Sequence, residues 1–265
     1  MTMAIRPWLA DHERVWLPWA SLVVFLAVWQ LTVSLGIVPP TFFSSPGQVV
    51  DAGARELGTP SFWNDVRISG TEFAVGYVIA FLVAVPFGLV TGWYRRLSYA
   101  IEAWLNGLNA TPRIALLPLV VLWAGIGQPA TTVIVFIGVF FPIAINAFYG
   151  VRTVDRGFLS VADSYGASDL RKFRTVILPS MLPFILAGAR LGIGRGVIGV
   201  VIGEFYSSQA GLGNYIFVAG ATLQIDKVLF GALFITALAL IAFTALQRLE
   251  RRFQAWRPDA QAALT

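Results

Sequence analysis

Residues that commonly perform catalysis are scarce in this chain. It has no cysteine, and its one histidine, His12, lies in a polar N-terminal stretch. Thiolate chemistry, disulfides and cysteine-ligated zinc are therefore excluded, and a histidine-based metal or catalytic site is not expected. A P-loop needs Gly-Lys-Ser or Gly-Lys-Thr, whereas Lys172 and Lys227 follow Arg171 and Asp226. The sequence thus predicts no catalytic residue, metal or cofactor in this chain.

Charged side chains inside long apolar segments are the second chemical signal, because an ionised group in the bilayer normally faces protein or water. Four residues make up this set: Arg113, Arg190, Arg195 and Glu204. Counted from Pro183 at ~1.5 Å per residue, Arg190 lies about 10 Å and Arg195 about 18 Å into the membrane. We hypothesise that the four line a translocation pathway, with Arg195 and Arg113 attracting an anionic solute.

Structural roles for the same charges remain open. Arg190 can extend to the cytoplasmic face, as long basic side chains do near helix ends. Arg195 can pair with Glu204 or Glu102, or bond carbonyl groups at a helix end. These alternatives predict that a neutral residue at 195 leaves transport unchanged.

Glycines recur at short intervals in the same apolar segment. The first three are four residues apart, and the last two extend the strip: Gly188, Gly192, Gly196, Gly199 and Gly203. Small residues at such spacing let two helices approach closely. The strip predicts helix packing, either static within one subunit or at a moving interface between two subunits.

The longest polar stretch, about residues 151 to 180, has the pattern of two short helices hinged at Gly166. Ser168 is suited to the N-cap of the second helix, Arg171 follows in that helix, and Pro179 is expected to end it. Small residues at the hinge allow close approach to a groove in a partner protein. A solvated connector is the alternative reading.

This stretch resembles the cytoplasmic signature of ABC importer permeases, which is Glu-Ala-Ala, three residues, glycine, nine residues and an aliphatic-x-Leu-Pro ending. Here Gly166 is followed by nine residues and then by V-I-L-P at 176 to 179. Ser160-Val161-Ala162 stands in place of Glu-Ala-Ala, and the nearest acid is Asp163. The resemblance implies that the hairpin couples the chain to an ATPase through these residues: Ala162, Asp163, Gly166, Ala167, Ser168, Arg171, Leu178 and Pro179.

Other segments between about residues 40 and 250 resemble the branch of these permeases that imports sulfonates, taurine, nitrate and related molecules. They are F-F-S-S-P-G-Q-V at 42 to 49, R-I-A-L-L-P-L-V-V-L-W-A-G-I-G at 113 to 127, F-F-P-I-A-I-N at 140 to 146, L-A-G-A-R-L-G-I-G-R at 186 to 195 and G-L-G-N at 211 to 214. The resemblance implies the type I importer permease fold, a second copy of the chain, two ATPase subunits that bind ATP and Mg, and a periplasmic solute-binding protein.

The elements that position these residues are predicted to be membrane helices. Hydrophobic residues make up 57% of the chain and charged residues 12%, whereas soluble domains carry about 25% charged residues. We predict an all-α membrane protein whose single permease domain, 17 to 250, has six spans over about 17–38, 72–93, 99–123, 130–149, 183–205 and 228–246. The third is expected to be broken, because it contains Asn106, Asn109 and two prolines. A short helix is predicted over 46–57, and Ser207 to Tyr215 is predicted to be a loop.

Basic residues predict the orientation in the membrane. Thirteen lysines and arginines fall in one set of connections and three in the other. The first set is Arg6, Arg14, Arg95, Arg96, Arg152, Arg156, Arg171, Lys172, Arg174, Arg248, Arg251, Arg252 and Arg257, and the second is Arg55, Arg67 and Lys227. This places the tails, 1–16 and 251–265, and the 151–180 loop in the cytoplasm of a bacterium, and the 46–57 helix and the 207–215 loop in the periplasm. No nucleic-acid partner is expected, because the basic residues form no single face.

An ion-coupled secondary transporter is the alternative function. Such a protein places acidic or histidine residues deep in its spans, whereas the acids here, Glu72, Glu102 and Glu204, lie at the ends of the predicted spans. We therefore expect a permease subunit of an ABC importer in the inner membrane that moves a small anionic solute and has no ATPase site of its own.

Overall fold

A computed structural model of the chain describes residues 13–39 and 42–254, and all regular secondary structure in these residues is helical. Five of the helices are long and apolar enough to cross a membrane, and a bent helix pair can supply a sixth span. The predicted all-α membrane fold is therefore confirmed. His12 lies outside the described residues, as do most of the N-terminal tail and of the C-terminal tail.

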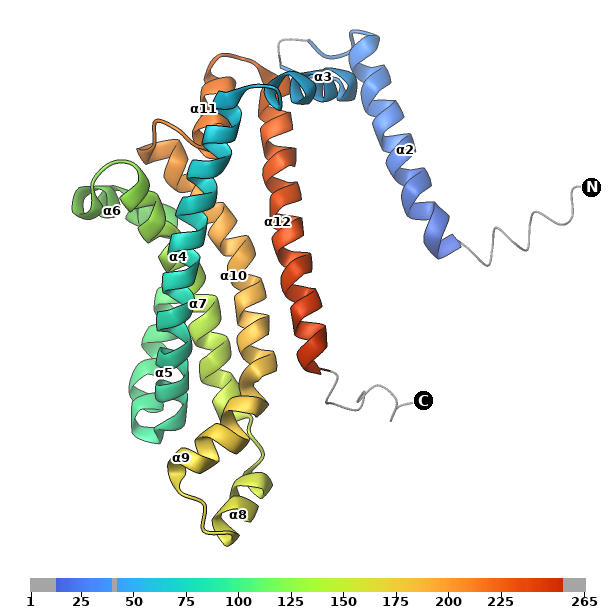
Figure 1. Ribbon diagram of the computed structural model, residues 1–265. Helices are drawn as coiled ribbons and strands as arrows, with labels where there is room; N and C mark the ends of the chain where they lie inside the picture. The colour runs from blue at the N-terminus through green and yellow to red at the C-terminus, as the bar shows by residue number, and fades with distance from the viewer. Residues whose placement is uncertain (1–12, 40–41, 255–265) are drawn as a thin grey trace, which may run out of the picture. The chain divides into compact units, whose positions relative to one another are not determined.

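Figure 1 labels the helices in chain order. Their bounds are α2 (Glu13–Ser34), α3 (Pro46–Glu56), α4 (Pro60–Trp93), α5 (Arg95–Ala110), the 3₁₀ turn η1 (Arg113–Leu116), α6 (Leu117–Ala124), α7 (Gln128–Arg152), α8 (Arg156–Ser164), α9 (Asp169–Lys172), the π-helical turn η2 (Phe173–Ile177), α10 (Leu178–Ser207), α11 (Leu212–Ala221) and α12 (Ile225–Gln254). The chain divides into two compact units, one of residues up to Trp63 with Tyr215–Leu233, and one of Asn64–Asn214 with the residues from Phe234.

Helix α7 is the centre of the second unit, and α10 runs alongside it (Figure 1). Val135, Val139 and Ile143 of α7 are fully buried in the main hydrophobic cluster. The glycine strip of α10 faces this helix: a Cβ at Gly188 would lie 3.0 Å from Ile143 Cα, and one at Gly203 would lie 2.9 Å from Thr131 Cα. The strip therefore packs within one chain and brings the two backbones together.

A second set of glycines packs α4 against α7. A Cβ at Gly76 would lie 2.8 Å from the carbonyl oxygen of Thr132, and one at Gly88 would lie 2.5 Å from that of Ala144. These α4 glycines are not among the residues predicted from the sequence to pack helices together. Helix α7 is thus held closely by α4 and by α10.

The structure corrects three boundaries. Helix α4 begins at Pro60, well before the predicted start of the span at Glu72. Hydropathy does not reveal the first turns of this helix, because they are polar. Pro179 does not end a helix; it lies in the first turn of α10, and the helical path is continuous from Asp169 through η2 to Ser207. The predicted 207–215 loop is shorter, since α10 extends to Ser207 and α11 starts at Leu212.

The predicted broken span is present as α5 followed by η1 and α6, with axes bent by 89°. Helix α5 ends at Ala110, and Thr111 and Pro112 are extended. Pro112 disfavours a helical conformation at the residue before it. This break places Arg113 at the start of η1.

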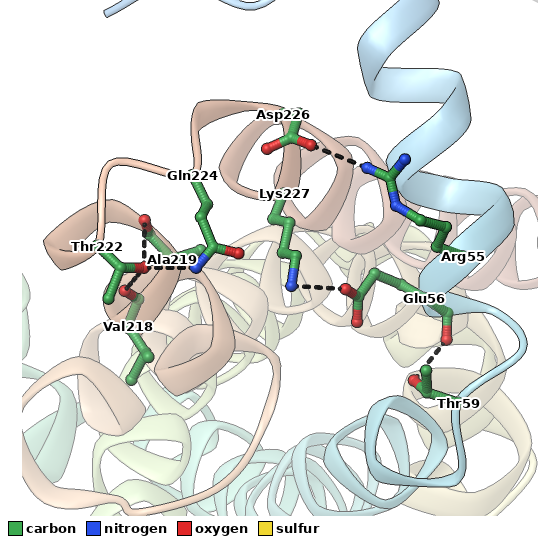
Figure 2. A network of polar contacts seen from close by, with 9 residues as sticks. All are labelled: Arg55, Glu56, Thr59, Val218, Ala219, Thr222, Gln224, Asp226 and Lys227. Carbon is green, nitrogen blue, oxygen red and sulfur yellow. Dashed lines mark hydrogen bonds and ion pairs between the residues drawn. The ribbon is translucent and has the colours of Figure 1, made fainter. Parts of the chain in front are cut away.

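In the first unit, α3 begins at Pro46 with a complete capping box, in which Ser45 and Gln48 each bond the backbone of the other. Two ion pairs tie its C-terminal end to the start of α12. Arg55 lies 3.2 Å from Asp226, and Lys227 lies 2.9 Å from Glu56 (Figure 2).

Candidate functional site

The hairpin between α7 and α10 is built by local capping. Asp155 precedes α8 and accepts from the N–H of Gly157 at 2.7 Å. Gly166 has φ of +66°, which a residue with a side chain rarely adopts, and it turns the chain between the two helices. Ser168 caps α9 by accepting from the N–H of Arg171 at 3.4 Å. The hinge and the cap lie at the residues the sequence indicated.

A lysine links the two arms of the hairpin. Lys172 Nζ lies 2.9 Å from Asp163 of α8 and 2.7 Å from Asp169 of α9. Asp163 is the acid nearest to the position where the importer signature has glutamate. Its carboxylate pairs with Lys172 of the same hairpin. Both carboxylates are open to solvent, which weakens the two ion pairs, so the backbone caps and the Gly166 turn hold most of the shape.

Large apolar side chains cover the outside of this hairpin. Phe158, Val161, Tyr165 and Leu170 are all more than half exposed, and Tyr165 is 86% exposed. No residue of α8 or α9 is buried. Contiguous exposed apolar groups beside arginines are typical of an interaction surface and unfavourable on a solvated connector.

Two arginines form a separate electropositive site. Arg113 donates to Asn109 Oδ1 at 3.1 Å, and its Nε is buried without a hydrogen-bond partner. Arg195 of α10 is exposed, and its positive charge acts on that of Arg113. Neither makes an ion pair with a carboxylate of the described residues. Both positive charges are therefore left without a carboxylate partner in this part of the chain.

The other two residues of the proposed pathway have partners in the protein. Arg190 lies 3.2 Å from Glu250 of α12 and over the ring of Phe243. Glu204 is fully buried, and its carboxylate accepts from Ser69 and from the backbone of Gly213. Both side chains are therefore bonded to other groups of this chain.

The pairings considered for Arg195 are not formed. Glu102 instead pairs with Arg152 at 2.7 Å, and Glu204 bonds Ser69. Sequence reasoning also missed the polar groups gathered around Glu204, because Asp65 and Ser69 are far from it along the chain.

The family described as "Binding-protein-dependent transport system inner membrane component" matches residues 84–255. The putative aliphatic sulfonates transport permease protein SsuC of Escherichia coli (strain K12) is 33% identical over 261 residues, covering 97% of both chains. The taurine transport system permease protein TauC of the same strain is 31% identical over 254 residues, covering 94% of this chain and 92% of TauC.

Solved structures share the fold. The MetNI methionine ABC transporter in inward-facing conformations contains a chain with a TM-score of 0.62 and 20% identity, over 74% of this chain and 99% of that one. A bacterial ABC transporter involved in the import of the acidic polysaccharide alginate gives 0.59 and 14%, over 93% and 99%. With its family match over most of its length, the chain belongs to the binding-protein-dependent transport system inner membrane components and is a permease subunit of an ABC importer.

Proposed function

We propose that the permease carries a small anionic solute with a sulfonate group, such as taurine or an alkanesulfonate, from a periplasmic binding protein to the cytoplasm. The relatives SsuC and TauC are described as aliphatic sulfonate and taurine permeases. The observation that carries the proposal is that Arg113 and Arg195 make no ion pair with a carboxylate of the described residues. A sulfonate has three acceptor oxygens, and guanidinium groups bind such oxyanions by charge-assisted hydrogen bonds.

The proposed assembly contains two copies of this chain, two cytoplasmic ATPase subunits and one binding protein. The exposed apolar side chains of the α8–α9 hairpin support contact with the ATPase. ATP and Mg are bound by that subunit, so this chain transmits motion and performs no hydrolysis. Both termini and the hairpin are placed in the cytoplasm by the excess of lysine and arginine in those segments.

The pathway role of Arg195 is tested by exchanging its charge. An anion about 4 Å from a guanidinium gains about 4 kcal/mol at an effective dielectric constant of about 20, before desolvation. We expect a net loss of about 1–3 kcal/mol for Arg195→Gln, which corresponds to about 5- to 150-fold slower uptake at subsaturating solute. Arg195→Lys keeps the positive charge but loses the planar guanidinium group. Its uptake rate should lie between those of Arg195→Gln and the unsubstituted complex.

The assay is uptake of labelled taurine or an alkanesulfonate into proteoliposomes that contain the assembled complex and its binding protein. Arg67→Gln, which removes an exposed arginine of α4, is the matched control and should transport normally. If Arg195→Gln transports like the unsubstituted complex while its subunits remain assembled, the pathway role of Arg195 is rejected.

A further inference from the structure

An apolar hollow of about 140 Å³ lies among α4, α10 and α12, and every residue that lines it belongs to the second unit. From α4 the lining residues are Val66, Ser69, Gly70 and Phe73. Steps of three and four residues put them on one face of that helix. Helix α12 contributes a face with the same spacing, which consists of Ile235, Leu238, Ala239 and Ala242. Each helix therefore turns one continuous face to this space.

Among the described residues, Ser69 is the only polar side chain in the lining, and it is already bonded. Its hydroxyl donates to Glu204 and accepts from the N–H of Leu212 at 2.8 Å. The other lining residues are aliphatic, aromatic or glycine. An apolar cavity of about 150 Å³ stays dry and can bind benzene. The hollow therefore suits a hydrocarbon group and neither an ion nor a polar solute.

Helix α10 turns different sides to the hollow and to the proposed pathway. It contributes Val197, Val200 and Val201 to the lining. With 3.6 residues per turn, these three positions lie about 140–240° around the helix from Arg195. The hollow is thus separate from the arginine proposed to meet the solute.

The hollow lies at the depth of the lipid hydrocarbon. Counted from Pro183 at ~1.5 Å per residue, Val197 to Val201 lie about 21 to 27 Å along a hydrocarbon core of about 30 Å. Leu238, which lines the hollow, is 40% exposed, and Leu240 on the opposite side of α12 is 62% exposed. The hollow is therefore continuous with the exposed apolar surface of a membrane span.

We propose that this hollow binds an acyl chain of a membrane phospholipid, which lies between α4, α10 and α12. Acyl chains are the abundant flexible apolar groups at this depth, and an unfilled apolar space loses dispersion contacts that such a chain supplies. Because the only polar group of the lining is already bonded, the site selects the hydrocarbon chain and not the headgroup. The bound chain completes the packing of α12 on α4 and α10. Neither the solute nor the ATPase enters this proposal.

Gly70 allows the hollow to be filled from the protein side. A Cβ at Gly70 would meet nothing within 4 Å, so Gly70→Leu places an isobutyl group there without displacing the backbone. Gly107→Leu is the matched control, because Gly107 of α5 is also exposed, with nothing within 4 Å of its Cβ position, and does not line the hollow. Both variants replace a helical glycine by leucine, so their gain in intrinsic helix propensity is the same.

The probe is phosphatidylcholine that carries a diazirine in one acyl chain, mixed as a minor component into nanodiscs that hold the assembled complex. After illumination, mass spectrometry of peptides locates the labelled residues. We expect labelling of Val66, Val201 and Ala239 that falls at least severalfold in Gly70→Leu and is unchanged in Gly107→Leu. Leu240 should be labelled equally in all three complexes. A phosphatidylglycerol probe with the same chain should give the same pattern.

Two results would overturn the proposal. Undiminished labelling of Val66 and Ala239 in an assembled Gly70→Leu complex would show that the acyl chain does not occupy this hollow. Labelling of Leu240 without labelling of the lining residues would show that protein, such as a second copy of the chain, covers it. The unsubstituted complex decides this second outcome whether or not Gly70→Leu assembles, and gel filtration with the ATPase checks assembly of each variant.

Discussion

The close contact between α10 and α7 gives a prediction with a matched control on the same helix. A Cβ at Gly188 would lie 3.0 Å from both the Ile143 Cα and the Pro142 carbonyl oxygen, whereas one at Gly194 would meet nothing within 4 Å. Side-chain rotation cannot relieve the first contact, because the atoms belong to the α7 backbone. Gly188→Ala must therefore move one helix relative to the other.

The magnitude follows from two opposing effects. Overpacking of a closely packed interior costs about 1–3 kcal/mol, and alanine in a helix gains about 0.5–1 kcal/mol over glycine. We expect a net destabilisation of roughly 0.5–2 kcal/mol for Gly188→Ala, and no loss or a gain of up to about 1 kcal/mol for Gly194→Ala.

Thermal unfolding of the complex in nanodiscs, followed by circular dichroism, measures this difference. Gly188→Ala should lower the apparent midpoint by a few degrees relative to Gly194→Ala. Equal midpoints would refute the assignment of the glycine strip to packing against α7. A loss of dimer in Gly188→Ala without any change in the midpoint would instead place the strip at a subunit interface.

Two further predictions concern the α8–α9 hairpin and the ion pair between Arg55 and Asp226. Phe158→Ser with Tyr165→Ser should reduce the amount of ATPase that copurifies by at least severalfold while leaving the melting midpoint unchanged, because both side chains are exposed; a stoichiometric ATPase in this variant would exclude the hairpin as its docking site. Arg55→Ala should cost less than about 1 kcal/mol of stability, because its pair with Asp226 is exposed; a midpoint lowered by many degrees would show that the pair has a larger role.

Features with a local cause could be predicted from the sequence. The hinge at Gly166 and the cap at Ser168 depend on residues a few positions apart. The broken span follows from Pro112, and the N-terminus of α3 follows from Ser45 and Pro46. In each case the residues that cause the feature lie within a few positions of it along the sequence.

Features that depend on distant partners could not be predicted. Gly211 and Gly213 are recognisable as turn residues, but only the fold brings Asp65 and Ser69 to this turn. The sequence predicts that Pro179 ends a helix, whereas it lies in the first turn of α10. Proline is common both just after a helix and in its first turn, so the neighbouring residues alone do not separate the two cases. The ion pair between Arg190 and Glu250 could not be predicted either, because the two residues lie far apart along the chain.

We propose that this permease moves a sulfonate-type anion only when a separate ATPase drives it. Uptake of labelled taurine and an alkanesulfonate into proteoliposomes that hold either the full complex or this chain alone tests this dependence. We expect uptake by the full complex that requires ATP, Mg and the binding protein, and none by the chain alone under a proton or sodium gradient. Gradient-driven uptake by the chain alone would show that no separate ATPase is needed.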